Sequence, residues 1–210
     1  MDRRTALKNL TKSIGYTVAA PTIMNILASC SSDKTALWTP LFLTSDEKHM
    51  VTHLVDLILP KTEIPGGLDV NIPQFLDAMY HNIELQPNQE LFKKGAEYFS
   101  KIFTQTLNKP VSSGTKEDFN VLLDKYLNLS KEDSKYILKQ QKLNVNAISE
   151  KETETYSIYK FLLSVRYYSI FGYCTSEKVG KEILAYDPVP GVYNGCISLE
   201  ETTNGRAWSL

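Results

Sequence analysis

The chain has few cysteines, no long apolar run and no excess of charge of either sign. Only three of its 210 residues are cysteines, which excludes a small scaffold dense in disulfides. No stretch reaches the roughly 18 continuous apolar residues that a membrane-spanning helix needs. Lys and Arg number 23 against 24 Asp and Glu, so no basic surplus predicts binding to nucleic acid. Hydrophobic residues make up 42% of the chain, which is enough for one globular domain with a core.

The motifs that commonly hold cofactors are also missing from the sequence. There is no G-x-G-x-x-G after a strand, no Walker-type phosphate loop, no H-E-x-x-H and no C-x-x-C pair. The absence of C-x-x-C-H excludes the usual covalent attachment of haem. We therefore expect no cofactor in this chain.

The first 30 residues have the features of an export signal. Arg3 and Arg4 are adjacent, as in twin-arginine signals, and an interrupted apolar stretch follows. The stretch ends in Leu27-Ala28-Ser29-Cys30, which resembles the lipobox of bacterial lipoproteins, where the cysteine sulfur is acylated and the chain is cut before it. We expect residues 1–29 to be a signal peptide, residues 30–43 a tether and residues 44–210 the folded domain. The alternative is an amphipathic first helix that belongs to the domain.

Cleavage before Cys30 would change the charge and the location of the chain. The leader carries four basic residues and one acidic residue, so the mature chain keeps 19 basic and 23 acidic side chains, a net charge of −4. Acyl chains on Cys30 would hold the domain at a membrane, facing the periplasm or the cell surface. That compartment is oxidising.

Hydroxyl caps and apolar periodicity predict an all-α fold. Thr44 and Glu47 form a capping box, and Thr115 and Ser130 each precede acidic residues in a first turn. No run alternates in the way that a half-buried strand does. We expect a single compact domain of about six to seven helices and an irregular, extended C-terminal tail after Tyr186. The expected helices run from Thr44 to Pro60, from Pro73 to Ile83, from Asn88 to Leu107, from Thr115 to about Asn128, from Ser130 to about Lys142, from Glu150 to Tyr173 and from Ser176 to Ala185.

One histidine pair has metal-ligand spacing. His49 and His53 lie four residues apart on one helix, which places both imidazoles on one face, with Asp46 and Asp56 nearby. No third ligand is evident, and both positions border the apolar stripe on its polar side. We expect a solvent-facing helix surface there, with a metal site as the alternative.

Two cysteines remain once Cys30 is assigned to the lipid anchor. In an oxidising compartment Cys174 and Cys196 can form a disulfide that ties the tail to the long helix. Such a bond would stabilise the fold by roughly 3 kcal/mol if it acts by constraining the unfolded chain. The alternative is two reduced thiols that pack as small apolar side chains.

Aromatic residues are dense between Tyr156 and Tyr173, beyond what one helix needs for its own core. Tyr and Trp are enriched at protein–protein interfaces because they combine a large apolar area with a polar atom. The surplus aromatics therefore predict a surface that binds another protein, with Tyr193 and Trp208 in the tail as candidate anchors.

Two parts of the sequence resemble the gluconate 2-dehydrogenase subunit 3 family, over about residues 40–200. The first part is a loop and a helix start, Leu59-Pro60-Lys61-Thr62-Glu63-Ile64-Pro65-Gly66-Gly67 and Ile72-Pro73-Gln74-Phe75-Leu76-Asp77, where members typically show I-L-P-x-T-x-x-P-G-A and V-x-x-F-I-D. The second part comprises Tyr168-Ser169-Ile170-Phe171-Gly172-Tyr173, Gly180 and Tyr186-Asp187-Pro188-Val189-Pro190-Gly191-Val192-Tyr193. Gly67 replaces the usual Ala.

The resemblance implies a small, non-catalytic subunit of a membrane-associated dehydrogenase. The large subunit of such complexes is a flavoprotein of the glucose-methanol-choline type that holds FAD and oxidises a sugar or sugar acid, and a cytochrome c subunit with haem c often accepts the electrons. The small subunit would carry the export signal for its folded partner. The alternatives are a free-standing lipoprotein that binds metal through His49 and His53, or one that binds carbohydrate through exposed Tyr and Trp.

Overall fold

The computed structural model describes residues 38–187, 189, 191 and 195–209 of the chain. Contacts within the chain divide it into residues 1–39 and residues 40–210. Trp38 and Thr39 are the only described residues of the first unit, and every helix of the described residues lies in the second.

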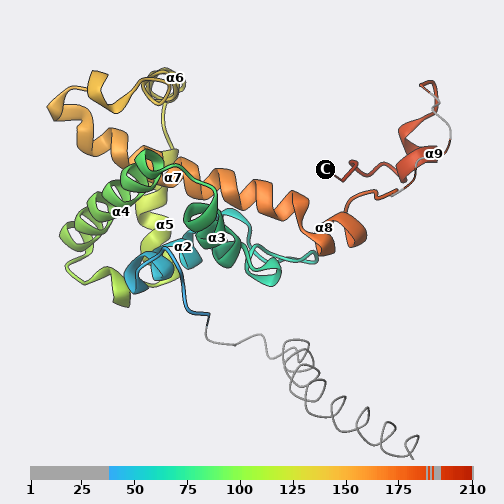
Figure 1. Cartoon of the computed structure of the whole chain (residues 1–210), viewed down its shortest axis with the longest axis horizontal. Coiled ribbons are helices and arrows are strands. Elements are labelled where there is room, and N and C mark those ends of the chain that lie inside the picture. Colours follow the sequence, from blue (N-terminus) through green and yellow to red (C-terminus); the bar gives the residue numbers. More distant parts are fainter. Residues whose placement is uncertain (1–37, 188, 190, 192–194, 210) are drawn as a thin grey trace, which may run out of the picture. The chain divides into compact units, whose positions relative to one another are not determined.

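The second unit is built from helices, which confirms the all-α prediction (Figure 1). Within the described residues there is no β-strand, and a single isolated bridge pairs Ala185 with Trp208. The α-helices are α2 (Ser45–Ile58), α3 (Ile72–Asn82), α4 (Gln86–Leu107), α5 (Lys116–Leu127), α6 (Lys131–Gln140), α7 (Glu150–Thr175), α8 (Glu177–Glu182) and α9 (Leu199–Thr203). Short 3₁₀ turns lie at Leu68–Val70, Val111–Ser113 and Val145–Ala147.

The predicted hydroxyl caps begin their helices. Thr44 accepts a hydrogen bond from the backbone N–H of Glu47, and the Glu47 carboxylate accepts one from the N–H of Thr44, which completes the capping box of α2. Thr115 starts α5 in the same way with Asp118, and Ser130 caps α6.

Helix α7 is the central element, and it packs most extensively against α4. The two helices approach closely because α4 has Gly95 at the crossing, where a Cβ atom would lie 2.1 Å from the carbonyl oxygen of Ser157. Helices α2 and α3 also pack on α7, and α5 covers α2. The core between them is largely aromatic; its fully buried rings are Phe92, Phe99, Phe103, Phe119, Tyr156 and Phe161.

The C-terminal tail differs from the expectation of an extended segment. A five-residue helix, α9, begins at Ser198, whose side chain forms a capping box with Glu201. The helix ends at Asn204, which adopts a left-handed conformation. The tail then returns to Ala185, which donates a backbone hydrogen bond of 2.8 Å to Ala207 and accepts one of 2.8 Å from Ser209.

Candidate partner-binding face

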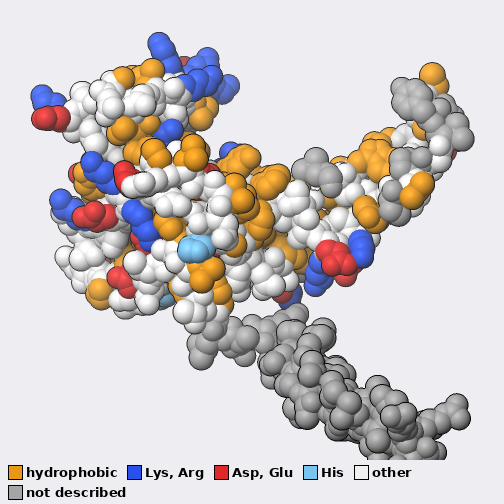
Figure 2. All heavy atoms as spheres, in the orientation of Figure 1, with side chains coloured by type: hydrophobic (Ala, Val, Ile, Leu, Met, Phe, Trp, Pro, Cys, Tyr) orange, Lys and Arg blue, Asp and Glu red, His pale blue; other side chains and the backbone are white. Residues whose placement is uncertain are grey.

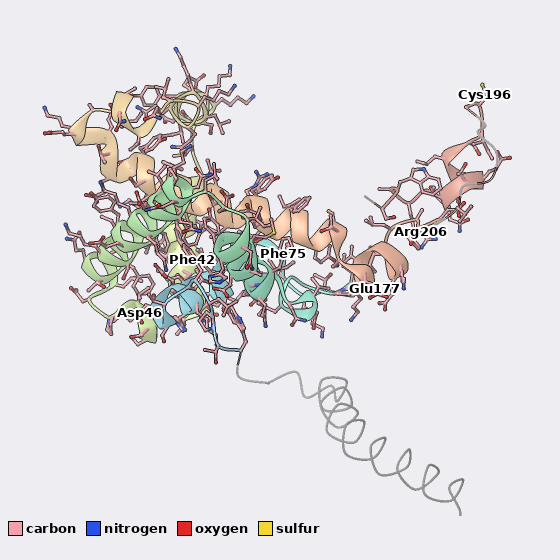
Figure 3. The ribbon with its side chains drawn as sticks, viewed as in Figure 1. Phe42, Asp46, Phe75, Glu177, Cys196 and Arg206 are labelled. Carbon is pink, nitrogen blue, oxygen red and sulfur yellow. The ribbon has the colours of Figure 1, made fainter. Side chains whose placement is uncertain are left out.

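The loop between α2 and α3 packs against the C-terminal part of α7. The Tyr173 hydroxyl donates a hydrogen bond of 2.6 Å to the carbonyl of Pro65 in this loop. The ring of Phe75 in α3, labelled in Figure 3, has its centroid 6.3 Å from that of Tyr168 and 6.1 Å from that of Phe171. The two segments that carry the family resemblance, about a hundred residues apart in sequence, therefore meet in one region.

Hydrogen bonds within the loop hold its conformation. The Asp69 carboxylate accepts from the backbone N–H of Gly66 at 3.0 Å and from the Lys61 ammonium at 3.2 Å. The bond from Gly66, and then the one from Lys61, hold the pKa of Asp69 below its usual value. Position 66 requires glycine, because a Cβ atom there would lie 2.6 Å from the backbone nitrogen of Lys61. The loop is therefore a defined structure that can present its surface to a partner.

Asp77 in α3 is a buried carboxylate with a structural role. Its side chain is 1% exposed and accepts three backbone hydrogen bonds, from Leu41 at 2.8 Å, Phe42 at 2.9 Å and Leu43 at 2.8 Å. The sequence placed Asp77 only within the resemblance and did not identify this role. The role could have been predicted from the position of Asp77, an acidic residue beside the apolar stripe of a helix, because a carboxylate that is buried there requires strong hydrogen bonds.

Lys93 in α4 attaches the same segment from the other side. Its ammonium donates a hydrogen bond of 2.6 Å to the carbonyl of Phe42 and forms an ion pair with Glu47. The ammonium also lies 4.1 Å from the centroid of the Phe42 ring. The start of the domain is therefore bound to both α3 and α4.

Apolar side chains are exposed along the C-terminal half of α7. Tyr167 is 60% exposed, Ile170 is 40% exposed and Phe171 is 38% exposed. The rings of Tyr167 and Phe171 stack with centroids 6.0 Å apart. Part of the aromatic surplus of this helix therefore lies on the surface, as the sequence predicted.

The turn between α3 and α4 extends this surface. Ile83 and Leu85 are 65% and 72% exposed, and they flank Glu84, whose carboxylate accepts a hydrogen bond from the Tyr168 hydroxyl. Burial, followed by the adjacent Glu84, raises the pKa of Tyr168. Figure 2 shows apolar side chains gathered over α7 and α3 in this region. We call this surface the α7 face; it comprises Ile83, Leu85, Tyr167, Ile170 and Phe171.

Of the two residues in the tail that were predicted to contact a partner, only Trp208 lies within the described residues. Trp208 is 48% exposed, beside the backbone pairing that joins the tail to Ala185. Tyr193 lies outside the described residues. Both remain candidate contacts with a partner.

The export and anchoring residues Arg3, Arg4 and Cys30 also lie outside the described residues. None of the helices in the described part of the chain is long and apolar enough to cross a membrane. Cys174 is half-buried near the end of α7 and Cys196 is exposed, and no bond joins the two sulfurs in the structure. The disulfide stays a prediction, which thiol alkylation of the unfolded, unreduced mature protein tests: a disulfide leaves both residues unlabelled.

His49 and His53, which the sequence placed on a solvent-facing helix surface, are half-buried and contact α5 and the turn before it. The ring of His53 stacks on Phe119 of α5 with a centroid distance of 5.2 Å, and His49 lies 4.5 Å from His53. A ring nitrogen of His49 lies 2.8 Å from the carbonyl oxygen of Gly114, within hydrogen-bond distance. Among the described residues, no group of three or more His, Cys, Asp or Glu side chains could hold a metal ion. The pair joins α2 to α5.

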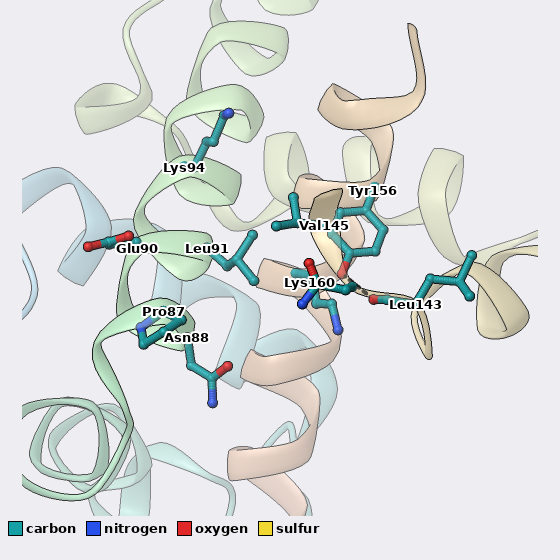
Figure 4. Close-up of a pocket in the computed structure, with 10 residues that line it drawn as sticks. Pro87, Asn88, Glu90, Leu91, Lys94, Leu143, Val145, Tyr156 and Lys160 are labelled. Atoms are coloured by element: carbon teal, nitrogen blue, oxygen red, sulfur yellow. Dashed lines mark hydrogen bonds between the residues drawn. The ribbon is translucent and has the colours of Figure 1, made fainter. Parts of the chain in front are cut away.

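An open groove of about 400 Å³ lies between the start of α4, the turn at Val145–Ala147 and α7 (Figure 4). Its main polar side chains from α7 already bind backbone carbonyls. The Lys160 ammonium donates a hydrogen bond of 2.9 Å to Gln141, and the Tyr156 hydroxyl donates one of 2.9 Å to Leu143. The groove therefore offers few polar groups that converge on a ligand.

A comparison with known protein families finds a match that covers most of the chain. Residues 45–191 match the family described as gluconate 2-dehydrogenase subunit 3. The match includes the loop, the start of α3 and the α7 face. No curated protein and no solved structure matches the chain significantly.

Proposed function

Since this chain belongs to the gluconate 2-dehydrogenase subunit 3 family, we propose that it is the non-catalytic small subunit of a membrane-associated, FAD-dependent dehydrogenase. The large subunit is a flavoprotein of the glucose-methanol-choline type that holds FAD and oxidises a sugar or sugar acid. A cytochrome c subunit with haem c is a possible third component. This chain contributes binding surface and export rather than redox chemistry.

The α7 face carries this proposal. It includes Ile170 and Phe171 of the second family segment, and it places them on the surface with Tyr167, Ile83 and Leu85. A group of exposed apolar side chains of this kind is typical of protein-binding sites, since exposure to water is unfavourable until a partner covers it. We propose that the flavoprotein binds here and that Trp208 and Tyr193 in the tail contribute contacts.

We propose that the chain also escorts its partner during export. Twin-arginine signals serve folded cargo, and a flavoprotein that binds FAD before export is such a cargo. Arg3 and Arg4 would then direct both subunits out of the cytoplasm, and lipid on Cys30 would hold the complex at the membrane on the periplasmic or cell-surface side.

The alternatives receive less support from the geometry. A free-standing lipoprotein that binds metal would need His49 and His53 open to a ligand, whereas His53 stacks on Phe119 and His49 contacts Gly114. A carbohydrate-binding lipoprotein would use exposed aromatics in a shaped groove. In the open groove beside α7 the aromatic residue is Tyr156, which is 1% exposed and whose hydroxyl already donates to the carbonyl of Leu143.

Co-purification tests the proposed interface. The tagged chain co-expressed with its flavoprotein should elute as a complex with the visible absorption of FAD, whereas the chain alone should elute colourless. The double variant Tyr167→Asp, Ile170→Lys introduces charges that must be desolvated on binding, so affinity should fall at least about 30-fold. Val121→Lys is the control, because Val121 is 56% exposed on α5, outside the α7 face. Equal yields of flavoprotein with both variants would show that the α7 face is not the interface.

Export is tested separately by Arg3→Lys combined with Arg4→Lys. The flavoprotein should then remain in the cytoplasm although its own sequence is unchanged. Normal export of the flavoprotein in this strain would show that this chain is not its carrier.

The lipid anchor is tested by Cys30→Ala in cells that lack the partner subunits. The variant should be released from membranes into the soluble fraction by a high-salt wash, which leaves a lipid anchor in place. Membrane association that persists without Cys30 after this wash would contradict the anchor.

A further inference from the structure

Helix α6 carries a basic surface that the proposed function does not use. Lys131, Lys135 and Lys139 recur every four residues, so their side chains fall within an arc of about 80° on the helix. Lys142 follows in the turn after the helix, and all four lysines are exposed. Leu138, which is 54% exposed, lies at the edge of the same arc. We call this surface the α6 basic face.

These four lysines lack acidic partners in the described part of the chain. The ion pairs there are formed by lysines of other segments: Lys61, Lys93, Lys109, Lys116 and Lys181. The Asp133 carboxylate of α6 accepts a hydrogen bond from the Ser130 hydroxyl at the helix start, away from the lysine arc. The charge of the α6 basic face is therefore available to an external anion, and Figure 2 shows Lys and Arg side chains gathered around α6.

Helix α6 packs on the rest of the domain through one side only. Its main contact is with α7, where Tyr136 and Gln140 bond to Glu152 near the start of that helix. The α6 basic face points away from this contact, because Gln140 is buried whereas the lysines are exposed. Helix α6 contacts the start of α7, whereas Tyr167, Ile170 and Phe171 of the α7 face lie in its C-terminal half (Figure 1). A ligand bound to the α6 basic face would therefore leave the α7 face open.

We infer that the α6 basic face binds the anionic headgroups of the membrane that carries the chain. Protein interfaces are enriched in Arg and depleted in Lys, whereas all four residues here are Lys, a flexible point charge suited to a fluid headgroup layer. A basic helix face with an exposed leucine at its border is typical of helices that lie on anionic bilayers. The mature chain has a net charge of −4, so the positive potential is local to α6 and does not suit a nucleic acid.

This inference rests on the membrane location proposed above and deepens it. Headgroup contacts at α6 would fix which side of the domain faces the bilayer. Lysines at an anionic surface each strengthen binding by roughly fivefold, and this attraction falls with salt.

Amine footprinting of the full chain tests the inference. The chain is bound to vesicles of phosphatidylglycerol mixed with phosphatidylcholine, or of phosphatidylcholine alone, and only the fraction that floats with the vesicles is acetylated. Mass spectrometry should show Lys135, Lys139 and Lys142 protected severalfold on the anionic vesicles, with protection lost at high salt. Lys94, Lys101 and Lys178 are exposed lysines outside α6 and serve as internal controls. Equal labelling of the α6 lysines on both vesicle types would overturn the inference.

A matched pair of variants sharpens the result. Lys135→Gln with Lys139→Gln and Lys142→Gln should weaken binding of the unacylated Cys30→Ser chain to anionic vesicles on the order of 100-fold, after subtraction of binding to neutral vesicles. The same change at Lys94, Lys101 and Lys178 removes equal charge and should have little effect, and Lys→Arg at the three α6 positions should retain binding. A triple α6 variant that binds vesicles normally but loses the flavoprotein would assign the face to a protein and contradict the inference. Salt-resistant membrane association of Cys30→Ala would instead contradict the lipid anchor of the proposed function and would not bear on the α6 basic face.

Discussion

The two halves of α7 have similar aromatic content and opposite surroundings. In the N-terminal half, Tyr156 and Phe161 are 1% and 0% exposed, because α4 covers them and contributes rings such as Phe92. In the C-terminal half, Tyr167 and Phe171 stack on each other at the surface. The neighbouring helix, rather than the residue type, decides which aromatics form the core.

This difference separates stability from binding within one helix. The buried rings contribute to the free energy of unfolding through the apolar area that they remove from water. The exposed rings contribute little to it, and the proposed partner surface would account for their exposure.

The largest effect on the free energy of unfolding is expected for a variant in the buried, N-terminal half of α7. Phe161→Ala removes a ring whose centroid lies 5.0 Å from that of Phe92 and 5.7 Å from that of Phe99. Loss of the transfer energy and creation of a cavity should lower the free energy of unfolding by about 3–5 kcal/mol. Urea unfolding followed by circular dichroism measures it. A loss below about 1 kcal/mol would mean that this half of α7 is not packed as described.

A smaller effect is expected at Asp77, the buried carboxylate that binds the backbone of residues 41–43. Asp77→Asn can keep the oxygen that accepts from Phe42 and Leu43, but it then directs an amide N–H group at the backbone N–H donor of Leu41. We expect a loss of about 2–3 kcal/mol in the free energy of unfolding, since buried donors lose a charged acceptor. Asp124→Asn on the exposed side of α5 is the control, and equal stability of the two variants would contradict the role of Asp77.

The exposed half of α7 should tolerate truncation. Tyr167→Ala combined with Ile170→Ala should change the free energy of unfolding by less than about 1 kcal/mol, because both side chains lie at the surface, 60% and 40% exposed. The same variant should lose more than about tenfold in affinity for the flavoprotein. A destabilisation as large as that of Phe161→Ala would remove the distinction between the two halves.

The smallest effect concerns pH and the contact between α2 and α5. Burial against Phe119, followed by the charge of His49, lowers the pKa of His53 below its usual 6.5. The unfolded chain therefore binds this proton more readily than the folded chain does, so stability present above about pH 6.5 should decline as the pH falls below that value. Urea unfolding across this range should show a shallower decline for His53→Gln. His81→Gln, which changes an exposed ring in α3, is the control; an identical slope in both variants would contradict the assignment.

Local signals in the sequence predicted most of the helices. Hydroxyl caps at Thr44, Thr115 and Ser130 marked three helix starts, since a capping box depends only on residues three positions apart. Helix α9 was missed although Ser198 and Glu201 carry the same signal, because five residues are too few to show an apolar stripe. The surplus of aromatics in α7 indicated an exposed surface but did not identify which rings form it.

The site depends on contacts that no local pattern contains. Asp77 binds backbone groups more than thirty residues earlier in the chain, and Tyr173 binds Pro65 more than a hundred residues away. The histidine pair was expected to face solvent because helix periodicity shows that a residue borders the apolar stripe, but not that α5 covers it. Side-chain environments of this kind require the packed structure.

The attachment of residues 41–43 has a mechanical consequence. A pull on the chain from its N-terminal side would be transmitted at these residues into α3 through the three bonds to Asp77 and into α4 through Lys93. All these bonds must break before α2 can be pulled from the domain. Tension on the proposed membrane tether would therefore be borne first by α3 and α4, and the first helix of the domain would be shielded from it.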